Sequence, residues 1–138
     1  MPAEPATVAR TMMIHDRASE SLGMTVLTNE AGHAVVTMTI REDMLNGFAI
    51  THGGFVFALA DTAFAIACND SDLVTVAAGA DITFLKATTA GDVLTATAIE
   101  RAKSGRSGIY DVEVLDAAGA IVAEFRGRSR RTNSPAPV

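Results

Sequence analysis

The run from Asn46 to Asn69, NGFAITHGGFVFALADTAFAIACN, constrains the fold more than any other part of the chain. A glycine pair is followed by GFVFALADTAFAIAC, a stretch rich in Ala and Leu, which favour helix. This stretch is apolar on almost every side, and a helix apolar all round belongs in an interior rather than on a surface. The run therefore predicts a buried central helix that begins at the Gly53–Gly54 pair.

Six strand-like segments flank this predicted helix. Two lie within Met24–Arg41, around a turn at Asn29–Gly32, and the second alternates apolar and polar residues as a half-buried strand does. The short glycine-containing separators imply antiparallel neighbours, because parallel strands need long crossovers. The predicted fold is α+β: a curled antiparallel sheet of about six strands wrapped around one long central helix. The four later strands are expected at roughly Leu73–Lys86, Val93–Lys103, Ser107–Asp116 and Ala120–Arg130.

The two ends of the chain add little to this core. Weak helical spacing from Ala6 to Leu22, stopped by Gly23, predicts a short N-terminal helix. The length of 138 residues fits one domain, assigned to residues 1–131. The last segment, TNSPAPV at residues 132–138, is expected to be a disordered tail.

Composition excludes several classes of function. The net charge of −5 argues against a nucleic-acid partner, which needs a positive surface. No secretory signal and no apolar stretch of about 18 residues is present, so a membrane role is not expected and a cytoplasmic location is. The single Cys68 permits no intrachain disulfide and is expected to be a buried, inert thiol. No His or Cys stands at metal-ligand spacing, so neither metal nor cofactor is expected.

Two features of the central run carry chemistry. A helix start exposes unpaired N–H groups at the positive end of the helix dipole, and glycine lets a ligand oxygen approach them. Gly53 could thus polarise a carbonyl, although a plain turn would use glycines equally well. Asp61 is a lone acid in an apolar helix, and a buried carboxylate needs either partners or a catalytic task.

The spacing of these two residues indicates how they could cooperate. They are eight residues apart, about 12 Å along a helix, whereas two groups acting on one carbon must each lie about 3 Å from it. If Gly53 and Asp61 act together, Asp61 works with Gly53 of a second subunit whose helix runs antiparallel. The active site would then lie at a two-fold interface and occur twice in each dimer.

The pattern Asn46-Gly47 … His52-Gly53-Gly54 … Asp61-Thr62-Ala63 resembles the hotdog-fold acyl-CoA thioesterases. Within them it is similar to the phenylacetate-degradation branch, the hydroxyphenylacetyl-CoA thioesterases. The segments AVVTMTI, MLNG, GDVLTATA and YDVEV also resemble that branch, so the similarity covers nearly the whole chain.

The resemblance implies a role for each residue of the motif. Gly53 would donate its N–H to the thioester carbonyl, with Gly54 beside it at the bound substrate. Asp61 of the partner subunit would be the general base or the nucleophile. Asn46 would order the substrate or the water, and His52 would shape the loop before the helix.

The remaining site residues are less well defined by the sequence. Some relatives use a strand hydroxyl to assist water; TVAAGADITF has no clear equivalent, and Thr62 is the substitute considered. The coenzyme A phosphates are expected to meet basic residues near the KSGRSG turn, although such charges are often only solvated. The RGRSRR segment at Arg126–Arg131 is read mainly as a solvated strand face. The proposed coenzyme A residues are Lys86, Lys103, Ser104, Gly105 and Arg106, with Arg101 nearby.

The favoured function is hydrolysis of an aryl- or arylacetyl-CoA thioester by a homodimer or a dimer-of-dimers tetramer. One alternative is a hotdog hydratase or dehydratase, which would need a catalytic His; His52 directly precedes the glycines, which argues against it. The other is a non-catalytic acyl-CoA sensor, which normally carries a DNA-binding segment that this chain has neither the room nor the charge to supply.

Overall fold

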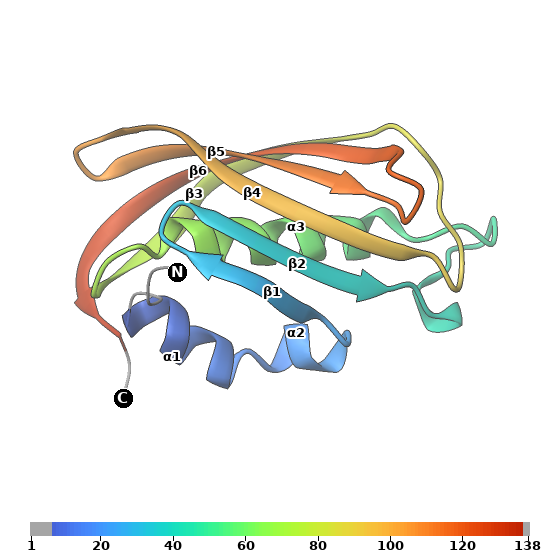
Figure 1. Cartoon of the computed structure of the whole chain (residues 1–138), viewed down its shortest axis with the longest axis horizontal. Coiled ribbons are helices and arrows are strands. Elements are labelled where there is room, and N and C mark those ends of the chain that lie inside the picture. Colours follow the sequence, from blue (N-terminus) through green and yellow to red (C-terminus); the bar gives the residue numbers. More distant parts are fainter. Residues whose placement is uncertain (1–6, 137–138) are drawn as a thin grey trace.

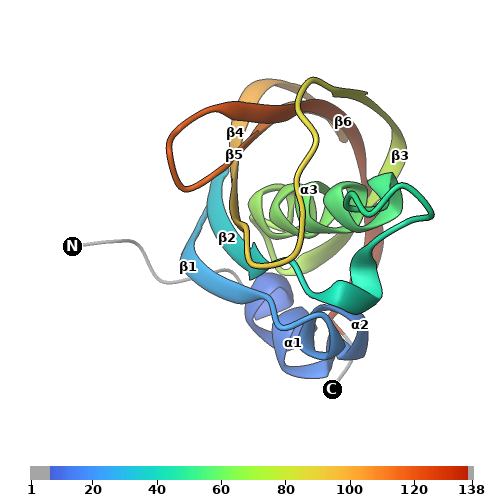
Figure 2. The ribbon, with the colours of Figure 1, turned by 90° about the vertical axis from the view of Figure 1, so that its right-hand side faces the viewer.

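The computed structural model describes residues 7–136, in which six antiparallel strands curl around one long helix (Figures 1 and 2). The strand order is β1-β2-β4-β5-β6-β3, so β1 and β3 are the two edges of the sheet. The α+β prediction is confirmed. In chain order the elements are α1 (Thr7–His15), α2 (Arg17–Ser21), β1 (Thr25–Glu30), β2 (His33–Thr39), the 3-10 turn η1 (Glu42–Met44), α3 (Gly53–Cys68), β3 (Leu73–Phe84), β4 (Val93–Ser104), β5 (Ser107–Leu115) and β6 (Ile121–Pro135).

The inner face of the sheet explains why α3 can lie so close to it. The predicted alternation in β2 is confirmed, and its inward residues are fully buried. In the register of β2 with β4, Ala34 faces Ala98, Val36 faces Ala96 and Met38 faces Leu94. The small side chains of Ala34, Ala96 and Ala98 leave room for a helix packed against the concave face.

Aromatic side chains fill the space between α3 and the other half of the sheet. The Phe64 ring, 1% exposed, lies with its centroid 5.6 Å from that of Tyr110 and 5.8 Å from that of Phe125. Gly127 of β6 faces this ring so closely that an added Cβ would lie 2.6 Å from two of its atoms. Cys68 is buried, and burial raises the pKa of its thiol to about 12. No helix between residues 7 and 136 is long and apolar enough to cross a bilayer.

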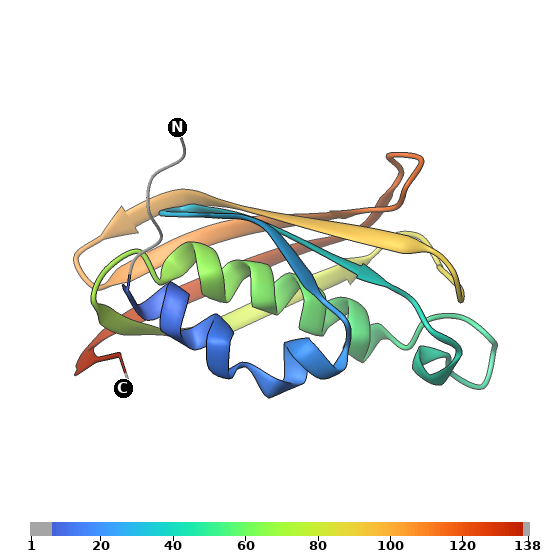
Figure 3. The same ribbon diagram turned by 60° about the horizontal axis from the view of Figure 1, so that its bottom comes forward.

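The N-terminal helix is interrupted, which the spacing of apolar residues did not predict. Asp16 ends α1 and caps α2, with its carboxylate accepting hydrogen bonds from the Ser19 N–H at 3.0 Å and the Ser19 hydroxyl at 2.6 Å. An Asp side chain competes for backbone donors in this way at helix starts. The two helices lie along the open side of the curled sheet, beside α3 (Figure 3).

The disordered tail was predicted to begin at residue 132, but the last strand extends beyond that residue. Strand β6 continues to Pro135, where it pairs with Leu73 of β3, and the Thr132 hydroxyl donates to the Val74 carbonyl at 2.7 Å. Residues 132–135 therefore belong to the sheet, because the edge strand β3 offers them backbone partners. Residues 137 and 138 lie outside the described part of the chain.

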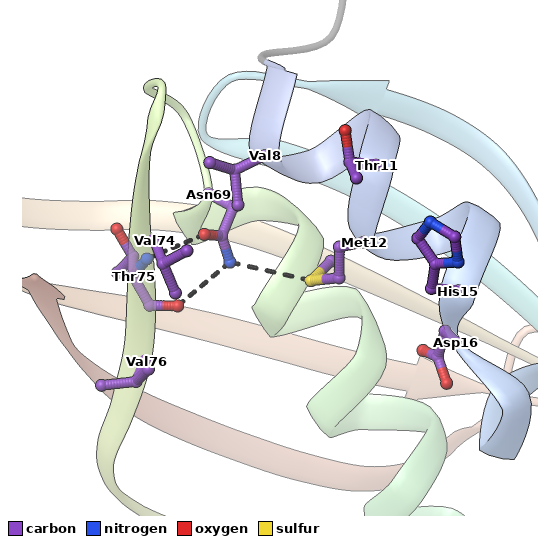
Figure 4. Close-up of a pocket in the computed structure, with 9 residues that line it drawn as sticks. All are labelled: Val8, Thr11, Met12, His15, Asp16, Asn69, Val74, Thr75 and Val76. Carbon is purple, nitrogen blue, oxygen red and sulfur yellow. Dashed lines mark hydrogen bonds between the residues drawn. The ribbon is translucent and has the colours of Figure 1, made fainter. Parts of the chain in front are cut away.

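The C-terminal end of α3 is tied to β3 by one buried amide. The Asn69 Nδ2 donates to the Ala65 carbonyl at 2.7 Å and to the Thr75 carbonyl at 3.1 Å. Its Oδ1 accepts from the Thr75 N–H at 2.9 Å, as Figure 4 shows. Asn69 is 3% exposed, so this clamp fixes the helix relative to the edge strand.

Candidate active site

The start of α3 leaves one backbone donor free. His52 is the N-cap residue, and its Nδ1 accepts a hydrogen bond from the Gly54 N–H at 3.3 Å. The His52 N–H donates to the Met44 carbonyl at 2.8 Å, which holds the loop before the helix. Within residues 7–136 the Gly53 N–H has no hydrogen-bond partner, so it can bind an acceptor from a ligand.

Asn46 organises the loop that leads to this helix start. Its Oδ1 accepts from the Phe48 N–H at 2.9 Å and from the Ile50 N–H at 3.4 Å, and its own N–H donates to the Ile50 carbonyl at 2.8 Å. The loop is tight enough that Ala49 has a φ of 60°. The carbonyl side of the amide is thus used in the fold, while its NH₂ group has no hydrogen-bond partner within residues 7–136.

A cleft of about 430 Å³ opens at this end of the molecule. It brings together Asn46, Gly53 and Lys86, three of the residues predicted to form the site. Lys86 forms an ion pair with Asp116, which holds the pKa of that carboxyl below its usual range. Phe84 also lines the cleft, and the sequence offered no signal for it.

Asp61 lies on α3, half-buried, and is not part of the cleft in its own chain. Burial raises the pKa of Asp61, and repulsion from the Asp16 carboxylate raises it further. Within the described residues no donor or cation stabilises its charged form. An acid kept in this state is suited to accept a proton near neutral pH.

Thr62 is engaged with the protein rather than free to assist water. Its hydroxyl donates to the Ala58 carbonyl at 2.8 Å and lies 3.2 Å from the Ser19 hydroxyl. Ser19 in turn donates to Asp16, so a chain of polar contacts links the N-terminal helices to the turn of α3 that carries Asp61.

Within one chain the predicted coenzyme A residues lie in two separate groups. Lys86 lies at the end of the sheet where β5 finishes, whereas the KSGRSG turn closes the other end, with Ser104 paired to Ser107. The nine residues of β5 separate the two groups by roughly 27 Å. Lys103 is paired with Asp70 beside the C-terminal end of α3. The predicted coenzyme A residues at the KSGRSG turn, away from Lys86, are Lys103, Ser104, Gly105 and Arg106.

The basic residues of β6 face acidic partners on neighbouring strands. Arg126 binds Asp111 through two hydrogen bonds, of 2.7 and 3.0 Å, and Arg128 binds Asp81 at 2.9 Å. The Arg126 guanidinium lowers the pKa of Asp111. These pairs match the interpretation of RGRSRR as a solvated strand face.

A second cavity, of about 440 Å³, lies between α1, β3 and the end of α3 (Figure 4). Met12 and Val76 contribute apolar surface, and His15 and Asp16 stand on the side of the N-terminal helices. Asp16 connects this cavity to Asp61, because the same carboxylate lines the cavity and raises the Asp61 pKa. The sequence did not predict this cavity, because it depends on how α1 packs across the open side of the sheet.

Comparison with known proteins identifies the class. The thioesterase superfamily profile matches residues 48–123, which include α3 and the strands β3, β4 and β5. The chain belongs to this family, and with its curled sheet around α3 it is a thioester hydrolase with the hotdog fold.

Individual relatives are similar over almost the whole chain. The acyl-coenzyme A thioesterase PaaI of Escherichia coli (strain K12) is 46% identical over 123 residues, which are 89% of this chain and 88% of that protein. The solved E. coli PaaI protein of the phenylacetic acid degradation operon superposes with a TM-score of 0.90 at 43% identity and covers 94% of each chain. A variant of the phenylacetic acid degradation protein PaaI from Thermus thermophilus gives a TM-score of 0.81 at 38% identity, over 85% of this chain and all of that one. The chain is therefore a homologue of the PaaI acyl-CoA thioesterases.

Proposed function

We propose that this thioesterase hydrolyses arylacetyl-CoA esters, of the phenylacetyl or hydroxyphenylacetyl type, to the free acid and coenzyme A. One observation carries the catalytic part of the proposal. Among the described residues, the Gly53 N–H in the cleft has no partner, and no donor or cation stabilises the Asp61 carboxylate on the same helix. The names of the similar PaaI proteins support the acyl-CoA substrate class and the link with phenylacetate degradation.

The proposed site is shared between two subunits. About 12 Å separates Gly53 from Asp61 along one helix, too far for both to act on one carbonyl. The edge strand β3 supports pairing with a second chain, because Val76 is 45% exposed there and Ala77 and Ala78 are also exposed. An antiparallel two-fold pair would bring Asp61 of one subunit to Gly53 of the other. A dimer, or a tetramer made of two such dimers, is the proposed assembly.

The proposed reaction needs only these groups and water. The thioester oxygen accepts the Gly53 N–H, which stabilises the negative charge that develops when the carbonyl carbon is attacked. With Asp61 as base, water loses a proton to the carboxylate as its oxygen bonds to carbon; the C–S bond then breaks, and the thiolate takes up the proton. With Asp61 as nucleophile, a carboxylate oxygen forms a mixed anhydride as thiolate leaves, and water hydrolyses the anhydride.

The two concavities support the orientation of the substrate. The cleft with Lys86 suits the coenzyme A side, since a cation there can meet a phosphate. The cavity between α1 and β3 is mostly apolar with a few polar groups, a composition that suits an aryl group. In the proposed dimer the acyl group passes from the cleft of one subunit past Asp61 into the cavity of the other.

The decisive assay measures thiol release from phenylacetyl-CoA, hydroxyphenylacetyl-CoA and straight-chain acyl-CoA esters from C4 to C16. We expect release from the arylacetyl esters, and Asp61→Asn should lower kcat by about 100-fold or more. The matched control is Asp72→Asn, because Asp72 is an exposed acid in the turn after α3. Binding without thiol release by the wild-type chain would refute hydrolysis, and full activity of Asp61→Asn would refute the site.

Mixed dimers test the shared site. Asp61→Ala and Gly53→Val chains should each be inactive alone, but a heterodimer would contain one site with both native groups. Random exchange of equal amounts should restore about a quarter of the wild-type activity, because half of the dimers are mixed and each has one intact site of two. No recovery after demonstrated subunit exchange would contradict the cross-subunit arrangement.

A further inference from the structure

Phe84 occupies the space that a side chain on residue 53 would need. A Cβ added to Gly53 would lie 2.9 Å from Phe84 Cζ, 3.3 Å from Cε2 and 3.4 Å from Cε1. These three atoms form the outer edge of the ring, so the ring points edge-on at the first residue of α3. The ring belongs to a different element, β3, and is brought to the helix start only by the fold.

The backbone beneath this ring is firmly held, although the ring itself is 53% exposed. Phe84 pairs with Ala123 of β6, and the next two N–H groups, of Leu85 and Lys86, both donate to the Val122 carbonyl, at 2.8 and 3.2 Å. One side of the ring contacts Gly53, and the remainder borders the cleft that also contains Asn46. A half-exposed aromatic ring on a fixed backbone therefore stands beside the free N–H.

The ring edge has a chemical consequence at this location. The hydrogen-bearing edge of an aromatic ring is the positive end of its quadrupole, and its face is the negative end. An oxygen that accepts the Gly53 N–H would gain negative charge during the reaction while lying close to this positive edge. A ring at this place would also shield one side of the N–H···O hydrogen bond from water, which would strengthen that bond.

We propose that Phe84 is a positioning residue for the thioester, holding the carbonyl against the Gly53 N–H and favouring the charge that develops on its oxygen. This inference rests on the proposed function and extends it to a residue outside the helix motif. A side chain at residue 53 would meet the tip of this half-exposed ring, so the ring would have to shift to admit it. Phe84 and residue 53 should thus behave as a coupled pair.

The test compares Phe84→Leu and Phe84→Ala with the wild type in steady-state hydrolysis of phenylacetyl-CoA. Leu keeps apolar bulk but has no ring edge, so kcat should fall about tenfold; Ala removes the wall, and kcat should fall by up to about 100-fold. KM should change much less than kcat, because the interaction is strongest in the transition state. Leu27→Ala, at a residue 61% exposed on β1, is the control for loss of an exposed apolar side chain.

A double-mutant cycle tests the coupling. Gly53→Ala alone forces the new methyl group against the ring, whereas Gly53→Ala combined with Phe84→Ala leaves space for it. The activity of the double variant should therefore be close to that of Phe84→Ala alone instead of showing the product of the two losses. Melting temperatures and circular dichroism spectra identify any variant that misfolds, and Phe84→Leu then decides in place of Phe84→Ala.

The outcomes separate this inference from the proposed function. If the wild type releases thiol and both Phe84 variants keep its kcat, or raise KM alone, the positioning role is wrong while the hydrolase activity stands. Independent losses in the double-mutant cycle would likewise overturn it. If the wild type releases no thiol from any arylacetyl ester, both the proposed function and this inference fall.

Discussion

Gly127→Ala is a severe perturbation despite adding only a methyl group. The new Cβ would lie 2.6 Å from Cδ1 and Cε1 of Phe64 and 2.7 Å from its Cγ. Carbon atoms in contact are normally about 3.5–4.0 Å apart, so the ring must retreat by about 1 Å. Phe64 cannot retreat freely, since it is 1% exposed and packed between the rings of Tyr110 and Phe125.

The expected cost follows from this overpacking. Adding a methyl group to a filled core costs about 1–3 kcal/mol. Replacing glycine also restricts the unfolded chain, which returns about 0.4–1 kcal/mol where the backbone is compatible. The net loss in the free energy of unfolding should be about 1–2 kcal/mol, or roughly 3–7 °C in Tm for a chain of this size.

The assay is thermal and urea unfolding followed by circular dichroism at one fixed protein concentration, because association shifts apparent stability. Gly47→Ala is the matched control: a Cβ there meets no heavy atom within 4 Å, so its stability should change by less than about 0.5 kcal/mol. Gly127→Ala with Phe64→Leu should lose at least about 1 kcal/mol less than the sum of the single changes. Equal stability of Gly127→Ala and the wild type, or simple additivity with Phe64→Leu, would refute the packing argument.

Three further predictions concern the site and its supports. Asp16→Asn removes the negative neighbour that, together with burial, raises the pKa of Asp61. Activity needs ionised Asp61 and is lost as the pH falls through this raised pKa, so the acid limb of the kcat/KM profile should move to lower pH. An unchanged acid limb would exclude this coupling. Asn69→Ala leaves the Thr75 N–H and carbonyl unpaired and should cost about 2–3 kcal/mol in urea unfolding; a change below about 0.5 kcal/mol would show that water replaces the amide. Lys86→Met should raise KM for the CoA ester about twofold to fivefold with kcat kept, and the effect should shrink at high salt; a loss confined to kcat would contradict a binding role.

Much of the fold could be predicted from the sequence, because patterns among neighbouring residues indicate its helix and strands. The helix α3 begins at Gly53, where a glycine pair precedes an Ala-rich apolar run, and the alternation in β2 identified the residues that are buried there. The break at Asp16 was not predicted, because the weak apolar spacing continues across it, although Asp is a residue type favoured at a helix start. The extension of β6 to Pro135 was missed for a similar reason: the polar segment after residue 131 is ordered by the partner strand β3, and not by its own composition.

The residues of the candidate site also fall into those that neighbouring sequence reveals and those that only the fold brings together. Asn46, His52 and Gly53 lie close together in the chain, so a motif can reveal them. Phe84 reaches Gly53 only through the order of strands in the sheet, and no spacing in the sequence encodes that contact. Lys86 and Lys103 were grouped as basic residues near turns, but the length of the strands between them sends those turns to opposite ends of the molecule.

The Asn69 clamp has a consequence for local unfolding. Its amide bonds both the last turn of α3 and the start of β3, so these two segments cannot open independently without leaving buried polar groups unpaired. We therefore expect them to exchange amide hydrogens as one cooperative unit, even though β3 is an edge strand, where fraying is usual. The edge along which a second subunit is proposed to pair is therefore kept in shape by the helix that carries Asp61.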